Sequence, residues 1–466
     1  MRKILLYNWV QFDDEDGVGG GVTVYLKNLI ERLINEKYEI YFLSSGNEYN
    51  IFKREVYINK TKNIFGEKVK TFKIVNSPVI APARWGVKNV ENIISNDKLK
   101  IILKNFILKY GPFDVIHFHN LEGLSLNCLD LKKDFVSTKF IFTFHNYVPV
   151  CPTVSYFRED IHKVCEKNNG DICIKCIKNL TKNKDYINEP VKRGLGYKNG
   201  WKIYKYVNKY KIFEKYKKIW LKEINLDNQI IYESSYRKYK ERFKKKINEN
   251  IDVILCVSRC TKRIVLENGF NDKKIKVSYI GTKVAENIKY KSPNNDQKLN
   301  IAYLGYANEQ KGYYFFIDAL SKLPIEYRKR LNVLIAAKDS KCDFIQNQLK
   351  NYNKIEIYNG YTHDNLEKIL ENIELGIVPV LWEDNLPQIA IEFIAKGVPI
   401  LCSDYGGASE LFNYKCFVFN GSDTNDLLNK LIYIINNKIE LKKFWNYTYK
   451  LVTMDEHIKE LKEFYE

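Results

Sequence analysis

Short apolar segments recur along this chain, and each leads into a polar or glycine-containing loop. They lie at residues 4–7, 38–43, 113–118, 139–144, 252–257, 299–304, 331–336, 355–358, 374–380 and 398–402. Helical patterns separate most of them. Apolar runs of this length, alternating with helices, are typical of parallel strands that are buried on both faces of a sheet. The sequence therefore predicts an α/β protein.

The length of the chain predicts more than one domain, since 466 residues exceed one typical hydrophobic core. The strand–loop–helix pattern restarts after a polar stretch at residues 286–298, which is the expected linker. We therefore expect two doubly wound domains, at residues 1–285 and 286–450, that face each other across a cleft. A final helix at residues 451–466 is expected to cross back to the first domain.

Residues 381–400 contain the most informative loop. Glu383, Asp384 and Pro387 precede an apolar helix pattern that ends at Lys396-Gly397, and a strand and the loop of Gly406 and Gly407 follow. Loops of this kind gather at the carboxyl ends of parallel strands, where ligands bind. The amides at a helix start favour anions. The stretch predicts half of a site for a phosphorylated ligand whose hydroxyls are held by carboxylates.

Three other segments carry candidate binding groups. The loop at residues 17–21 is rich in glycine and follows the first strand, so a ligand could approach its backbone closely. Lys311-Gly312 begins a helix, which suits a phosphate. Two strands end in histidine, at His119 and His145. His145 is the better functional candidate, and we expect His117 to be a packed structural residue.

Four cysteines lie close together in the sequence just after His145. They are Cys151, Cys165, Cys173 and Cys176. The CxxC spacing of the last pair is typical of two thiolates that grip one tetrahedral zinc ion. The pattern predicts a structural zinc site, and the alternative is a folded insertion with reduced thiols. Together with the basic segment that follows, these cysteines form an expected insertion at about residues 150–248.

Residues 178–246 are strongly basic, and part of this segment interleaves lysines with aromatic residues. Trp201, Tyr204, Tyr216 and Trp220 could lie at a bilayer interface, with lysines on anionic head groups. The alternative is a solvated basic helix whose aromatic side packs on the domain. Single-stranded nucleic acid uses a similar mixture, but we consider it the weakest candidate partner.

Net charge and targeting signals indicate the partners and the cellular location that we expect for this chain. The formal net charge of +19 indicates an anionic partner, such as a membrane surface, nucleic acid or a phosphorylated substrate. The apolar start is too short for a signal peptide, and no uncharged apolar run reaches about 18 residues. We expect a cytoplasmic protein, in contact with the inner face of the membrane if the basic segment binds lipid.

These residues together resemble a known family. Two Rossmann-like halves, Gly20-Gly21-Val22, His145, Gly305 with Lys311-Gly312, and the acids near residue 390 resemble retaining glycosyltransferases of the GT-B fold, the family 4 or group 1 enzymes. That family has a Glu-x7-Glu motif. Asp384 and Glu392 meet the spacing here, whereas Glu383 is one residue earlier, so the choice between Glu383 and Asp384 stays open.

The resemblance implies a role for each matching residue. Glu392 would hold the ribose hydroxyls of a UDP- or GDP-sugar, and Lys311 would neutralise the diphosphate. Groups near the transferred sugar or phosphates would be His145, Glu383 or Asp384, Asn385, Leu386, Pro387, Gly20, Gly21, Gly305, Gly406, Gly407 and Glu410. The family usually has an arginine directly after the glycine of the preceding strand, but Tyr306 stands there in this chain.

The resemblance implies transfer of a sugar to an acceptor hydroxyl with retained configuration and without a catalytic metal. The acceptor would be a glycan or a lipid-linked sugar in bacterial surface polysaccharide synthesis. Two alternatives remain: a sugar-nucleotide epimerase of the same fold, and a catalytically degenerate homologue that only binds a glycan or acts as a scaffold.

Overall fold

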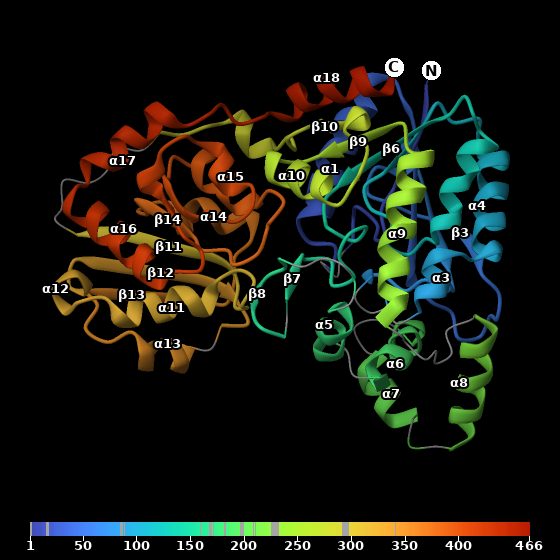
Figure 1. Ribbon diagram of the computed structural model, residues 1–466, viewed down its shortest axis with the longest axis horizontal. Coiled ribbons are helices and arrows are strands. Elements are labelled where there is room, and N and C mark those ends of the chain that lie inside the picture. Colours follow the sequence, from blue (N-terminus) through green and yellow to red (C-terminus); the bar gives the residue numbers. More distant parts are fainter. Residues whose placement is uncertain are drawn as a thin grey trace.

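The computed structural model describes residues 2–14, 18–83, 87, 89–158, 160–166, 170, 172–180, 183–195, 200–207, 209, 211–224, 233–290, 298–340 and 342–466. Two α/β domains lie side by side in this part of the chain, and each is built on its own sheet (Figure 1). The predicted fold class is confirmed. The expected linker is described only at its ends, since residues 291–297 lie outside these ranges.

The N-terminal sheet has eight strands within the described residues, in the order β10-β9-β6-β5-β1-β2-β4-β3. Neighbouring strands are parallel except for β3, which runs antiparallel to β4 at the edge. The strands are β1 (Lys3–Tyr7), β2 (Glu39–Glu48), β3 (Tyr57–Thr61), β4 (Val69–Val75), β5 (Val115–Phe118), β6 (Lys139–Phe144), β9 (Val253–Cys256) and β10 (Ile275–Val277).

The C-terminal sheet is entirely parallel over the described residues, in the order β13-β12-β11-β14-β15-β16. Its strands are β11 (Leu299–Tyr306), β12 (Leu331–Lys338), β13 (Lys354–Tyr358), β14 (Leu375–Val378), β15 (Ile400–Ser403) and β16 (Val418–Phe419). The central strands β14 and β15 are buried at every position. Burial on both faces explains why these strands read as continuous apolar runs in the sequence.

Helices cover both sheets. They are α1 (Gly20–Leu33), α3 (Val90–Ile94), α4 (Asp97–Tyr110), α5 (Cys173–Leu180), α6 (Asn183–Gly194), α7 (Gly200–Val207), α8 (Lys211–Glu223), α9 (Glu233–Asn250), α10 (Arg259–Glu267), α11 (Tyr313–Lys322), α12 (Ile325–Arg328), α13 (Cys342–Gln348), α14 (His363–Leu370), α15 (Gln388–Ala395), α16 (Thr424–Asn436), α17 (Ile439–Lys443) and α18 (Met454–Tyr465). Ser95 is extended and separates α3 from α4.

The last helix, α18, returns to the N-terminal domain and packs against α1 (Figure 1). His457 of α18 bonds to the Tyr25 hydroxyl at 2.8 Å, and the Tyr465 hydroxyl lies 2.9 Å from His117 Nδ1. His117 also bonds to the Thr143 hydroxyl and is fully buried. It is therefore a packed, hydrogen-bonded residue, as the sequence suggested.

The insertion contains the small hairpin of β7 (Phe157–Arg158) and β8 (Lys163–Val164), followed by α5 to α9. Its aromatic side faces the protein: Tyr204 is 4% exposed and Trp220 is 2% exposed. The Tyr216 hydroxyl donates to the Ile51 carbonyl oxygen. The suggestion that Tyr204 and Trp220 lie at a bilayer surface is wrong, because both form a core with residues of the N-terminal domain. The side chain of Trp201 lies outside the described part of the chain.

No helix within the described residues is both long enough and apolar enough to span a membrane.

Candidate active site

A cleft of about 1170 Å³ lies between the two domains, at the carboxyl ends of their strands. It brings together most of the predicted site residues. From the N-terminal domain these are Gly20, Gly21 and His145, and from the C-terminal domain Gly305, Lys311, Asp384, Asn385, Leu386, Pro387 and Glu392. Glu383, Gly406, Gly407 and Glu410 do not line it.

Lys311 and Asp384 form an ion pair at the cleft wall, with Nζ 2.6 Å from Oδ2. The ammonium also lies 5.2 Å from the centre of the Trp382 ring. Lys311 is one residue ahead of Gly312, which caps α11 with φ of +70°. A Cβ at Gly312 would lie 1.6 Å from the Pro379 carbonyl oxygen, so only glycine fits there. The loop thus fixes a cation beside the amides at the start of α11.

Glu383 and Asp384 serve different contacts. Asp384 faces the cleft and Lys311, whereas Glu383 accepts from Arg263 at 2.8 Å and from the Cys260 thiol at 2.9 Å. Both partners belong to α10 of the N-terminal domain. Glu383 is therefore a contact between the domains, and Asp384 is the acid that the cleft offers to a ligand.

The loop with Gly406 and Gly407 supports the acidic loop from behind. The Gly406 amide donates to Glu383 at 3.0 Å, and the Gly407 amide donates to the Asp384 carbonyl oxygen at 2.8 Å. A Cβ at Gly406 would lie 2.4 Å from that same carbonyl oxygen. These glycines therefore do not line the cleft, since the backbone of residues 383–385 occupies the space beside them.

Glu410 also belongs to the contact between the domains. Its carboxylate accepts from the backbone amides of Arg259 and Cys260 at 2.8 and 2.6 Å, and from the Tyr279 hydroxyl at 2.7 Å. These amides are at the N-terminus of α10, which favours an anion. Glu410 therefore bonds to the N-terminal domain and does not line the cleft.

Glu392 lies on α15 and is 5% exposed. The Tyr361 hydroxyl donates to its Oε2 at 3.3 Å. Burial raises the pKa of Glu392 from its ordinary value of 4.5 to about 7. A buried carboxylate at the cleft wall is suited to accept hydrogen bonds from ligand hydroxyls, which would compensate for its lost hydration.

The raised pKa of Glu392 predicts a pH-dependent stability difference. The pKa of Glu392 is higher in the folded chain than in the unfolded chain. Between these two pKa values the folded chain therefore binds more protons, and the free energy of unfolding falls as the pH rises through about 7. We expect Glu392→Gln to be more stable than the unchanged protein at pH 8, by up to about 3 kcal/mol, and nearly equal at pH 4.5. Denaturant unfolding at both pH values measures this, and an equal difference at the two would contradict it.

His145 lies where β6 ends, and its ring bonds through Nε2 to His119 Nδ1 at 3.2 Å. Burial, and then the nearby His457, lower its pKa to about 3. The pKa of His119 is also lowered, mainly by burial. His145 is therefore neutral at physiological pH and can donate or accept a hydrogen bond at the cleft.

The four cysteines of the insertion are all buried, and none of the four forms a disulfide bond. Among the residues that the structure describes, no three His, Cys, Asp or Glu side chains are arranged to hold a metal ion. The predicted zinc site is therefore not found. Burial raises the pKa of Cys165 and Cys176 to about 12, which keeps both thiols protonated, and Cys176 donates to Asp160 instead.

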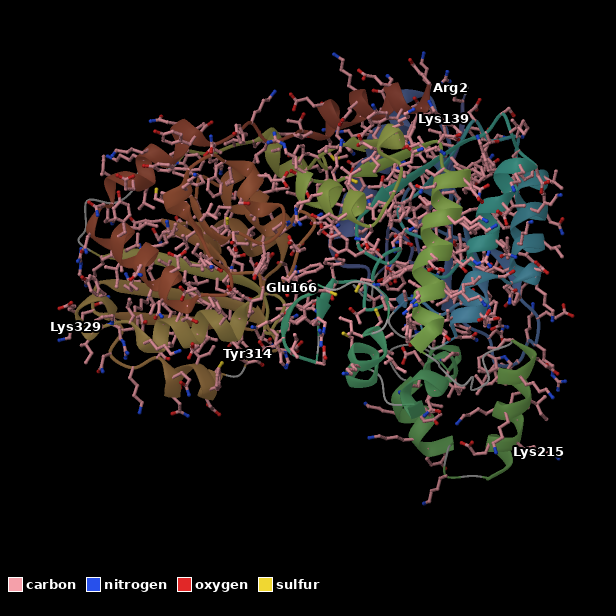
Figure 2. All side chains as sticks on the ribbon, viewed as in Figure 1. Arg2, Lys139, Glu166, Lys215, Tyr314 and Lys329 are labelled. Atoms are coloured by element: carbon pink, nitrogen blue, oxygen red, sulfur yellow. The ribbon has the colours of Figure 1, made fainter. Side chains whose placement is uncertain are left out.

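The insertion also reaches the C-terminal domain near the cleft. The Gln310 amide donates to the Ser155 hydroxyl at 3.4 Å. Figure 2 shows Glu166, which follows β8, beside the C-terminal domain. The cysteine-containing loop is therefore packed between the two domains.

Three residues at or beside the cleft were not found from the sequence: Tyr361, Gln388 and Arg263. Gln388 donates to the Gly21 carbonyl oxygen at 2.8 Å and so joins the two halves of the cleft. Each acts through a partner that is far away in the sequence. No local spacing could have indicated them.

The site is thus a cleft between two Rossmann-like domains whose wall carries a lysine, an aspartate and a buried glutamate. Residues 284–451 match the family model described as Glycosyl transferases group 1, and residues 19–170 match the one described as Glycosyltransferase Family 4. The chain is therefore a glycosyltransferase of the group 1 and family 4 type. No curated protein matches its sequence.

Solved structures share the fold at low sequence identity. Sucrose-phosphate synthase from Thermosynechococcus elongatus is 14% identical with a TM-score of 0.60, and the match covers 100% of this chain and 98% of that one. The α,α-trehalose-phosphate synthase of Burkholderia xenovorans is 11% identical, with a TM-score of 0.55 and complete coverage of both chains. Anabaena HepE, in complex with UDP and glucose, is 11% identical, with a TM-score of 0.52 and coverage of 100% and 99%. At these identities the likeness shows the fold alone.

Proposed function

We propose that the protein transfers a sugar from a UDP- or GDP-sugar to an acceptor hydroxyl, with retention of configuration, in the synthesis of a bacterial surface polysaccharide or a lipid-linked glycan. The observation that carries this proposal is the shared cleft, where Lys311, its partner Asp384 and buried Glu392 all line one space. The similar Anabaena HepE was solved with UDP and glucose, which supports a nucleotide sugar as donor.

The donor nucleotide would be held mainly by the C-terminal domain. Glu392, supported by Tyr361, would accept hydrogen bonds from the ribose hydroxyls. Lys311 would bind the diphosphate. Lys338 lines the same cleft and is paired in register with Tyr306. We propose that it supplies the second cation, in place of the arginine that the family usually has at the position of Tyr306.

The transferred sugar would lie between the domains. Asp384, the backbone of residues 385–387 and His145 would hold its hydroxyls, with Gly20 and Gly21 close to the phosphates or the acceptor. In the reaction the acceptor oxygen bonds to C1 of the sugar, the bond from C1 to the diphosphate oxygen breaks, and the departing diphosphate takes the acceptor proton. Lys311 would stabilise the charge that develops on the diphosphate.

A donor panel tests this proposal. The full chain is titrated with UDP-, GDP- and ADP-sugars, and slow hydrolysis of the bound donor is then measured without an acceptor. We expect one nucleotide class to bind, and Glu392→Ala to weaken binding about tenfold or more, which corresponds to the loss of a hydrogen bond to a charged group. No binding by any donor would overturn the transferase proposal. Release of an altered, intact nucleotide sugar would favour an epimerase.

We further propose that the enzyme docks on an anionic membrane through α7 and α8. Lys215, Lys218 and Lys222 lie on one exposed face of α8, and Ile219 between them is 41% exposed. On α7, Tyr206 is 70% exposed. Figure 2 shows Lys215 at the tip of the N-terminal domain, far from the C-terminal domain. An exposed face of lysines with a few apolar side chains complements anionic head groups.

Vesicle binding tests the docking surface. We expect the replacement of Lys215, Lys218 and Lys222 by glutamine to lower the affinity for phosphatidylglycerol vesicles about a hundredfold, because each lysine near an anionic surface contributes about 1 kcal/mol. Co-sedimentation with the vesicles measures this affinity. The matched control replaces Lys98, Lys104 and Lys109 of α4 by glutamine, which removes the same charge from another helix of that domain. Equal losses in the two triple variants would show that net charge, and not this face, determines binding.

A further inference from the structure

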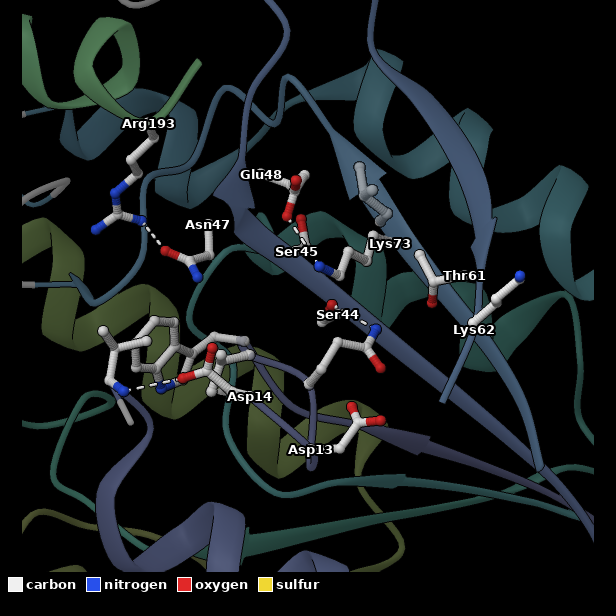
Figure 3. Close-up of a pocket in the computed structure, with 15 residues that line it drawn as sticks. Asp13, Asp14, Ser44, Ser45, Asn47, Glu48, Thr61, Lys62, Lys73 and Arg193 are labelled. Carbon is white, nitrogen blue, oxygen red and sulfur yellow. Dashed lines mark hydrogen bonds and ion pairs between the residues drawn. The ribbon is translucent and has the colours of Figure 1, made fainter. Parts of the chain in front are cut away.

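The N-terminal domain contains a second cavity, of about 430 Å³, at the carboxyl ends of β1, β2 and β4. Figure 3 shows its polar side chains, with Asn47 and Arg193 on one side and Asp13 and Asp14 on another. None of the residues assigned above to the donor nucleotide lines it.

This cavity adjoins the cleft between the domains. Asp13 and Asp14 line both spaces. The Asp13 carboxylate accepts from the Ile64 amide at 3.0 Å, and the Asp14 carboxylate accepts from the Val18 amide at 2.9 Å. Backbone bonds therefore hold both acids in place at the junction. A molecule seated in the cavity could extend a hydroxyl past them toward the donor sugar.

The wall of the cavity is polar but balanced in charge. It carries three carboxylates, at Asp13, Asp14 and Glu48, and three cations, at Lys62, Lys73 and Arg193. The cations are largely engaged: Lys73 pairs with Glu48 at 3.0 Å, and Arg193 pairs with Glu189 at 3.0 Å. A phosphate site would instead concentrate cations that face the ligand. The cavity is therefore suited to a neutral ligand.

The remaining polar groups favour a ligand rich in hydroxyls. Ser44 and Gln11 line the cavity, and the Gln11 amide donates to Ser44 at 3.0 Å. Gln11 is 6% exposed, and its Oε1 has no hydrogen-bond partner in the described part of the chain. A buried acceptor without a partner is best satisfied by a donor, and each hydroxyl of a saccharide both donates and accepts.

The insertion shapes this cavity through Arg193 of α6. Its side chain is 4% exposed, and its Nη1 donates to the Ala81 carbonyl oxygen at 2.5 Å, to the Gly46 carbonyl oxygen at 3.3 Å and to Asn47 Oδ1. The pairing of β2 with β4 is irregular between Ser45 and Glu48, and such irregularities redirect side chains. Arg193 therefore fixes Asn47 at the wall of the cavity.

We propose that this cavity is the acceptor subsite, that it takes a neutral, polyhydroxylated saccharide unit, and that Arg193 is a positioning residue that acts through Asn47. The proposal rests on the proposed transferase function. It assigns to the insertion a part in acceptor specificity, through Arg193 of α6 and Asn47.

The test measures, by saturation-transfer NMR, the binding of glucose, N-acetylglucosamine, galactose and glucose 6-phosphate to the full chain with UDP present. We expect at least one neutral sugar to bind, and Asn47→Ala to weaken it three- to tenfold. Asn59→Ala, on the exposed edge strand β3, is the matched control and should change nothing. UDP binding and acceptor-independent donor hydrolysis should stay within twofold in both variants, so a failure of the transferase proposal is seen separately.

Arg193 is tested in transfer to whichever sugar binds. We expect Arg193→Gln to raise the acceptor KM with kcat within about twofold, and Arg193→Lys to restore part of the loss. Thermal unfolding shows whether the Arg193 variants fold. If they do not, the sugar affinity of Asn47→Ala alone tests the proposal. The proposal is overturned if no neutral sugar binds, or if glucose 6-phosphate binds tenfold tighter than glucose. It is also overturned if Asn47→Ala and Asn59→Ala bind the neutral sugar with equal affinity.

Discussion

Replacing Lys311 by alanine should lower kcat/KM for sugar transfer roughly a hundredfold to a thousandfold, which is the usual effect of removing one group that stabilises an oxyanion in the transition state. Lys311 is held in place by its 2.6 Å ion pair with Asp384 and by the loop that Gly312 closes. Negative charge grows on the diphosphate as the bond to C1 breaks. A preorganised ammonium there stabilises the transition state more than the bound donor.

The control for this variant is Lys322→Ala on the same helix, α11. Lys322 pairs with Asp318 at 2.6 Å, is 55% exposed and does not line the cleft. It should therefore leave kcat/KM within twofold, because an exposed pair of this kind contributes little. Steady-state transfer kinetics with the donor found in the panel measure both variants. A loss below threefold in Lys311→Ala would contradict the assigned role.

Asp384→Asn should lower kcat/KM about ten- to a hundredfold, because it removes a charge-assisted hydrogen bond to Lys311 and a carboxylate that faces the donor sugar. The matched variant is Glu383→Gln, which changes the adjacent acid in the same way. Glu383 contacts Arg263 and does not line the cleft. Its loss should therefore act mainly on closure of the domains.

The two acid variants are separated by two measurements. Stopped-flow donor binding should show a slower closing step for Glu383→Gln and an unchanged one for Asp384→Asn, because only Glu383 bonds across the domains. Transfer kinetics should show the larger loss in Asp384→Asn. If Glu383→Gln lost more activity than Asp384→Asn at saturating donor, the assignment of the sugar-facing acid would be reversed.

The sequence was sufficient for the features that depend on neighbours along the chain. The apolar runs predicted the strands, since burial on both faces leaves no polar alternation. Helix starts also follow local chemistry: the Ser258 hydroxyl caps α10 and accepts from the Thr261 amide at 3.1 Å. Lys311-Gly312 was identified as a loop at a helix start for the same local reason.

The sequence failed where spacing was a poor guide to distance. The CxxC pair predicted a zinc ligand set, but two thiols at close spacing do not fix where the other two lie, and no metal arrangement is found among the described residues. The aromatic residues of the basic segment could face lipid or protein, because a helical pattern gives a face but not its partner. In the structure, Tyr204 and Trp220 pack against Tyr49 and Ile51 and so face the protein.

By itself, the sequence determined two α/β halves, an acidic loop between residues 381 and 400, and a phosphate-suited lysine, because all of these follow from local pattern and backbone chemistry. Only the tertiary structure decided that Asp384 faces the cleft and Glu383 does not. The Glu-x7-Glu spacing favoured Asp384 without excluding Glu383. Arg263 and the Gly406 amide hold Glu383 away from the cleft, and both are distant in the sequence.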